Sequence, residues 1–118
     1  MSYDLDFWKY KNGVSLEHHS VYERLSDGEH VEGVEDLPLE AMLLRLKEIF
    51  SDGWSQLDEL AWESDGRGAF QIFTTSQFFR VDCYSMEGED MNRFIDLGAE
   101  FGCPLYDPQV ETRFDGNG

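Results

Sequence analysis

The chain has 118 residues, of which 25 are aspartate or glutamate and 9 are lysine or arginine, so its formal net charge at pH 7 is -16. A negative field of this size repels nucleic acids and anionic membranes and attracts basic proteins. Hydrophobic residues make up 41% of the sequence and aromatic residues 14%, which is enough apolar material for a folded domain and excludes a disordered acidic tail.

The length predicts a single domain spanning residues 1–118, with a frayed end from about residue 115. No stretch approaches the roughly 20 apolar residues that cross a bilayer. The opening residues also lack the basic and apolar segments of an export signal. We therefore expect a cytoplasmic protein in which Cys83 and Cys103 are free, buried thiols.

The first elements predicted along the chain are a strand and a short helix. Aromatic, acidic and apolar residues alternate over residues 3–10 and predict a strand, which the Asn12-Gly13 pair interrupts. Ser15 then has the side chain of a helix N-cap, and the helix that it predicts runs to about Leu25.

A longer helix is predicted next, after an acidic loop over residues 27–36. Pro38 is suited to the start of a helix, and apolar side chains recur along one stripe of residues 39–50. Leu44 falls outside this stripe among the polar side chains, so we expect it to be exposed.

Three strands follow in the prediction, over about residues 57–63, 69–74 and 77–84. The last two are separated only by the short segment Thr75-Ser76. Such a tight connection indicates an antiparallel hairpin.

A final helix is predicted over residues 88–101, with Gly98 on its apolar face and Gly102 after its end. A glycine in that position suits a helix that lies close against a sheet. The predicted order is β-α-α-β-β-β-α, followed by a short extended tail. It indicates an α+β domain in which an antiparallel sheet of about four strands is packed by helices on one face.

The acidic loop is the first candidate for a binding site. Its carboxylates repel one another, which costs folding free energy unless a partner neutralises them. The alternative is a solvated loop without a binding role. The candidate residues are Asp27, Glu29, Glu32, Glu35 and Asp36.

The outer face of the sheet is the second candidate. If Cys83 and the apolar residues in phase with it face the core, then Phe78 and Tyr84 point the other way, and Trp8 joins them. Aromatic side chains of this kind are typical anchors of protein interfaces. The alternative is that a helix or the C-terminal tail covers them. The acidic residues expected on the same face are Asp4, Asp6, Glu59, Glu63 and Asp82.

Catalytic and metal-binding motifs are scarce in this sequence. His19 and Glu23 are four residues apart on the predicted helix and could contact one ion, but no third ligand accompanies them, and His18 lies on the apolar face. Cys83 has several acidic neighbours in the sequence, which disfavours a reactive thiolate. We therefore expect no enzyme, no metal and no cofactor. A small metal-dependent enzyme built on the two histidines and Glu23 is kept as a competing hypothesis.

Three segments of the chain resemble small bacterial immunity proteins, which neutralise the toxins of contact-dependent growth inhibition and related polymorphic toxin systems. The first is Tyr-Asp-Leu-Asp-Phe-Trp-Lys-Tyr, at residues 3–10. The second is Phe-Gly-Cys-Pro-Leu-Tyr-Asp-Pro-Gln, at residues 101–109, with Arg113-Phe114 after it. The hairpin over residues 71–84 is the third.

The resemblance implies a cytoplasmic, non-enzymatic protein that binds one cognate toxin domain. Many toxins of these systems are nucleases, whose substrate requires a basic cleft. The resemblance transfers no binding residue, since the interfaces of such proteins differ with their toxins. A third hypothesis is an interaction module that binds a basic protein of the host cell. The identity of the toxin, the mode of inhibition and the oligomeric state stay open at this point.

Overall fold

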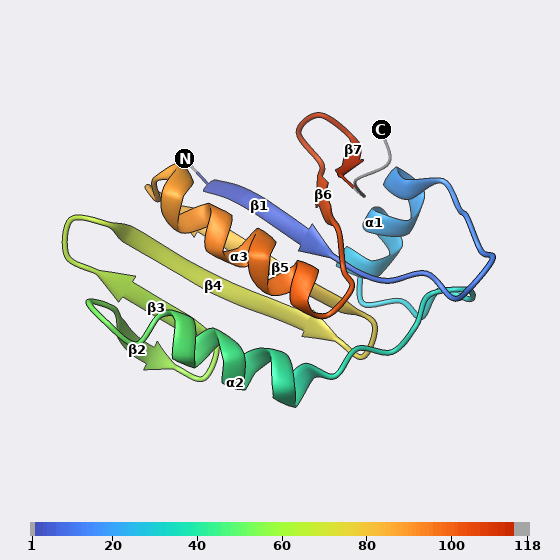
Figure 1. Cartoon of the computed structure of the whole chain (residues 1–118). Coiled ribbons are helices and arrows are strands. Elements are labelled where there is room, and N and C mark those ends of the chain that lie inside the picture. Colours follow the sequence, from blue (N-terminus) through green and yellow to red (C-terminus); the bar gives the residue numbers. More distant parts are fainter. Residues whose placement is uncertain (1, 115–118) are drawn as a thin grey trace.

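Within residues 2–114, which the computed structural model of the protein describes, seven antiparallel strands form one sheet and three helices pack against it (Figure 1). The order across the sheet is β2-β3-β4-β5-β1-β6-β7. The frayed end predicted from about residue 115 lies outside the described residues. The helices are α1 (His18–Ser26), α2 (Leu39–Ile49) and α3 (Gly88–Glu100). The strands are β1 (Ser2–Phe7), β2 (Ser55–Asp58), β3 (Ala61–Ser64), β4 (Gly68–Thr75), β5 (Phe78–Tyr84), β6 (Leu105–Asp107) and β7 (Thr112–Phe114).

The α+β class is confirmed, but the sheet has more strands than the four predicted. The segment predicted as one strand over residues 57–63 is the β2–β3 hairpin, and the predicted tail is the β6–β7 hairpin. Both turns lack glycine and are stabilised by an aspartate side chain. Asp58 accepts the Leu60 N–H at 2.8 Å, and Asp107 accepts the Gln109 N–H at 2.9 Å.

One face of the sheet is covered by α2 and α3, which lie side by side (Figure 1). The apolar stripe of α2 packs on this face as predicted, and Leu44 is 62% exposed. The predicted phase of β5 is also confirmed, because Phe79, Val81 and Cys83 belong to the same core. Arg45 and Glu100 connect the two helices at their surface, at 3.0 Å.

Gly98 allows α3 to lie close to β1. A Cβ atom at this position would lie 2.5 Å from Phe7 Cδ1 and 2.7 Å from the carbonyl oxygen of Cys103. The expectation that this glycine brings the helix against the sheet is confirmed. Gly102 has a φ of 75° just after the helix, as predicted for a residue that ends it.

The helix α1 lies on the opposite face of the sheet, so the prediction of helices on one face only was wrong. Val21 and Leu25 of α1 form a second core cluster with Trp8, Phe78 and Tyr106. The N-cap of α1 is Glu17, whose carboxylate accepts the Ser20 N–H at 2.6 Å, and not the predicted Ser15. Among the described residues, no helix is both long enough and apolar enough to cross a membrane.

Candidate functional site

Two of the three aromatic residues predicted as anchors are buried. Trp8 and Phe78 both have no exposed surface, and the Trp8 ring lies 5.1 Å from the ring of Tyr106, measured between centroids. The alternative that a helix and the C-terminal segment cover them is therefore correct, because α1 and β6 do so. Tyr84, at 39% exposure, is the predicted anchor that stays accessible.

The acidic loop between α1 and α2 is fixed to the rest of the protein. Its apolar residues Val31 and Val34 are buried in the second core cluster. The side chain of Gln77, in the β4–β5 turn, is buried and makes three hydrogen bonds to the loop. It accepts the Val31 N–H and donates to the Val31 and Val34 carbonyl oxygens, each at 2.9 Å. The loop therefore has a defined conformation despite its lack of regular structure.

The substitution Gln77→Ala should release this loop. It would leave the Val31 N–H and two carbonyl oxygens of the loop without their partner. We therefore expect the free energy of unfolding to fall by about 2 kcal/mol. Amide hydrogen exchange at Val31 should quicken accordingly. Gln56→Ala removes an exposed glutamine of β2 and is the control. Equal exchange rates at Val31 in the two variants would contradict this account of the loop.

The carboxylates of the loop point outward while its apolar residues point inward. Glu29 pairs with Arg24 at 3.5 Å, and Glu35 pairs with Lys9 at 3.6 Å. Asp27, Glu32 and Asp36 are exposed. Among residues 2–114, none of these three has a lysine, arginine or histidine nitrogen within 4.0 Å. The structure thus places all five predicted residues in one ordered loop and leaves three of them without a counter-charge.

Most basic side chains of the protein are already engaged by its own carboxylates. This leaves few cations to screen the remaining acidic surface. The engaged residues are Lys9, Arg24, Arg45, Arg67, Arg80 and Arg93.

A second acidic group lies on the sheet face that carries α1. Asp4 of β1 is directly opposite Asp82 of β5, and Asp6 is opposite Arg80 in the same ladder. Arg80 Nε lies 3.1 Å from the Asp82 carboxylate, and the guanidinium lies over the ring of Phe73. Tyr22 of α1 donates a hydrogen bond to Asp4 at 3.1 Å.

Asp6 is the member of this group with the most unusual surroundings. Its side chain has no exposed surface, and neither carboxylate oxygen has a hydrogen-bond donor among the described residues. Burial and the neighbouring Asp4 raise the pKa of Asp6 to about 9. The group is therefore protonated at neutral pH, when Asp4 can accept its hydrogen bond.

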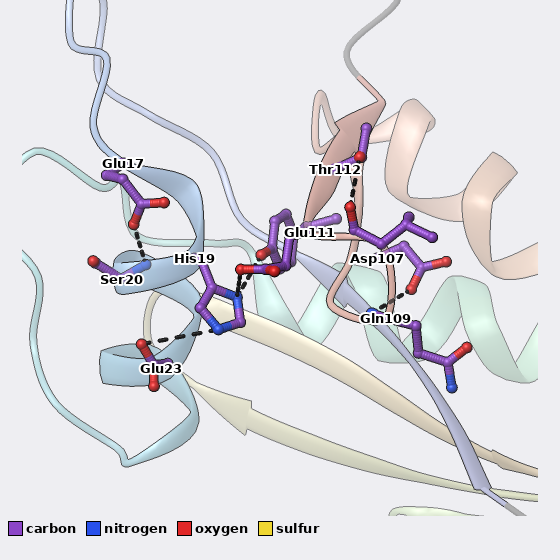
Figure 2. A network of polar contacts seen from close by, with 10 residues as sticks. Glu17, His19, Ser20, Glu23, Asp107, Gln109, Glu111 and Thr112 are labelled. Carbon is purple, nitrogen blue, oxygen red and sulfur yellow. Dashed lines mark hydrogen bonds and ion pairs between the residues drawn. The ribbon is translucent and has the colours of Figure 1, made fainter.

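The histidines of α1 turn toward different partners. His18 Nδ1 lies 2.7 Å from the hydroxyl of Tyr10. Figure 2 shows His19 between Glu23 and Glu111, at 4.0 Å from Glu23 and 3.5 Å from Glu111. The Tyr106 hydroxyl lies 2.8 Å from His19 Nδ1 as well. Within residues 2–114, no group of three or more histidine, cysteine, aspartate or glutamate side chains is arranged to hold a metal ion.

The two cysteines are free and buried, as predicted. Burial is the main cause that raises the pKa of Cys83 to about 12 and of Cys103 to about 11. Both side chains are therefore thiols at neutral pH and not nucleophilic thiolates.

The sequence did not indicate the roles of Gln77 and Asp6. Gln77 was predicted as the first residue of a strand, which does not show that its side chain holds the acidic loop. The alternation of β1 placed Asp6 on an outer face without showing what covers it. The chain matches no protein-family model, no curated protein and no solved structure.

Proposed function

We propose that the protein is an immunity protein, which binds a cognate basic toxin domain of a bacterial competitor and neutralises it by stoichiometric occlusion. The toxin would in the first instance be a nuclease, and the complex would form in the cytoplasm. One observation supports the proposal: the acidic loop over residues 27–36 is held in a fixed conformation, with three carboxylates that no cation of residues 2–114 neutralises.

A fixed loop favours tight binding. A partner that docks on a pre-organised surface loses less conformational entropy than one that has to order a flexible segment. Val31, Val34 and Gln77 have already restricted this loop during folding. A basic surface that covers the loop would relieve the repulsion among its unpaired carboxylates.

The charge of the protein suits inhibition of a nuclease. The active cleft of a nuclease has to be basic because it binds phosphates. A carboxylate-rich loop can occupy such a cleft in place of the nucleic acid backbone. Complementary charges also accelerate the encounter of the two proteins, which is useful when a few toxin molecules suffice to kill.

Charge reversal in the loop tests the proposal. We expect Glu32→Lys combined with Asp36→Lys to weaken binding of the toxin at least tenfold, mainly through slower association at low salt. Thermal stability should stay the same or increase, because neither carboxylate has a cationic partner within residues 2–114. Glu40→Lys combined with Asp96→Lys makes the same change of net charge on exposed positions of α2 and α3 and should bind nearly as the unchanged protein does.

The toxin for this measurement would come from capture with the tagged protein, identified by mass spectrometry. Recovery of the basic C-terminal part of a large secreted protein supports the proposal. Recovery of a basic housekeeping protein would favour the alternative, an acidic interaction module of the host cell. If both double variants bind the toxin equally well, the loop is not the interface.

A further inference from the structure

The outer face of the sheet is open beside α1. That helix packs over Trp8, Phe78 and Tyr106, at the end of the sheet where β1 leaves it. Farther along the strands, Glu63 of β3 and Gln71 of β4 are exposed on this face, together with Tyr84 of β5.

One row of residues crosses this open face at right angles to the strands. The pairing registers place Ala61, Gln71, Asp82 and Asp4 side by side, on β3, β4, β5 and β1 in turn. At the β3 end, the row runs into a shallow pocket at the β2–β3 turn. That pocket is lined by Asp58, Glu59, Leu60, Ala61, Gln71 and Ile72.

The β1 end of the row is electrostatically unfavourable as it stands. Asp4 and Asp82 are directly opposite each other, and like charges in that position destabilise a sheet. Asp6 adds a third carboxyl group, diagonal to Asp82. Arg80 is the cation that the sheet supplies here, and it is drawn to Asp82 and to the ring of Phe73.

Asp6 provides a second, independent indication that this place lacks positive charge, since it lies here as a neutral acid whose hydrogen bond goes to Asp4. It is fully buried behind Asp4, and in its ionised form both oxygens lack a donor within the described part of the chain. The charged and titratable groups around it are Asp4, Arg80 and Asp82 from the sheet, Tyr106 from β6 and Tyr22 from α1. Among these described groups, Arg80 is the cation. The other positive charge available to the Asp4–Asp6 pair is a proton.

We propose that Asp4 and Asp82, with Asp6 behind them, receive one arginine side chain of a basic protein partner, whose surface lies across this row. The proposal rests on the proposed function for the nature of the partner. A guanidinium group is flat and presents several N–H donors, so it can bridge two carboxylates on neighbouring strands. Next to Asp82 in the row, Gln71 is exposed and can contact the partner surface, whereas Ala61 is buried.

Charge complementarity selects this occupant over a second copy of the chain. A second copy also has a net charge of -16, and its open face would bring another set of carboxylates against Asp4 and Asp82. The row continues to Asp58 and Glu59 at the pocket, so a basic surface finds carboxylates at both of its ends.

The site can be tested without the toxin, with acetyl-arginine methylamide as the probe and its citrulline analogue as the uncharged counterpart. We expect the arginine probe to cause saturable shifts of the side-chain carboxyl carbons of Asp4 and Asp82 in NMR spectra at constant ionic strength. Asp4→Asn combined with Asp82→Asn should weaken the probe about tenfold, because two charge-assisted hydrogen bonds are lost. Asparagine keeps an oxygen that accepts from Tyr22, so the fold should persist.

Glu40→Gln combined with Asp96→Asn removes the same charge from α2 and α3 and is the matched control, which should bind the probe as before. Equal shifts with citrulline, or equal affinity in the two double variants, would overturn the site. Dimers formed by the unchanged protein and abolished by Asp4→Asn with Asp82→Asn would also overturn it, in favour of a second copy.

The same variants separate this inference from the proposed function. If a captured basic toxin binds the sheet-face variant normally but loses affinity when the loop is reversed, the arginine site is wrong and the immunity function stands. If the arginine probe binds at Asp4 and Asp82 but the captured partner is a housekeeping protein, the site stands and the immunity function is wrong.

Discussion

The folded protein should lose stability as the pH rises from about 4 to about 9, and Asp6→Asn should abolish this loss. Burial, with the negative charge of Asp4, raises the pKa of Asp6 from 3.8 to about 9. Between these values the unfolded chain releases the proton that the folded protein keeps. Unfolding therefore becomes easier with each unit of increasing pH across this window.

The expected size of this effect is large. Each pH unit in the window corresponds to about 1.4 kcal/mol of unfolding free energy. At pH 7 the burial of Asp6 therefore costs on the order of 4 kcal/mol, compared with a total stability of roughly 5–15 kcal/mol for a typical domain. Asparagine has nearly the same shape, keeps a donor toward Asp4 and does not ionise.

Urea unfolding of the unchanged protein and of Asp6→Asn across this pH range measures the difference directly. The two proteins should have similar unfolding free energies near pH 4. The stability of Asp6→Asn relative to the unchanged protein should then increase steadily toward pH 9. Asp96→Asn removes an exposed carboxylate of α3 and should show no such divergence. A constant difference between the unchanged protein and Asp6→Asn would mean that Asp6 is ionised in the folded state.

Gly98→Ala is expected to destabilise the protein by about 2–3 kcal/mol. The new methyl group would lie 2.5 Å from a ring carbon of Phe7 and 2.7 Å from the backbone oxygen of Cys103, so that α3 would have to move away from β1. Alanine has a higher helix propensity than glycine by about 1 kcal/mol. The expected net loss of stability therefore requires that the steric cost at Gly98 exceed this gain.

Gly88→Ala is the matched control, because no atom lies within 4 Å of a Cβ at that position of the same helix. It should leave stability unchanged or raise it slightly. Thermal and urea unfolding of the two variants give the comparison. Equal stability of the two alanine variants would show that α3 does not lie as close to the sheet as described.

The elements that could be predicted from the sequence are those with enough residues to show a period. The eleven residues of α2 carry a full apolar stripe behind Pro38, and the β4–β5 hairpin alternates on both sides of a short turn. The strands β6 and β7 have three residues each, which is too short for alternation to be recognised. The β2–β3 turn at Glu59-Leu60 has neither glycine nor proline, so the segment was predicted as one strand.

The candidate surfaces were predictable to a different degree. The acidic loop follows from composition, because five carboxylates occur within ten residues and two valines among them are suited to hold the loop in place. The burial of Trp8 and Phe78 depends on where α1 and β6 pack, which local patterns do not encode. The alternation of the strands correctly placed these two residues on the outer face of the sheet. They are core residues and not exposed anchors because α1 and β6 pack over them.

The position of β1 inside the sheet has a consequence for the time at which the protein can complete its fold. β1 pairs with β5 on one side and β6 on the other, and Tyr3 donates a hydrogen bond to Asp107. The β4–β5 hairpin can close from neighbouring residues, but β1 has to wait for partners that the ribosome makes much later. Folding should therefore be limited by contacts between residues distant in sequence. A nascent chain that ends before β6 lacks Tyr106 and cannot complete the core cluster in which α1 packs.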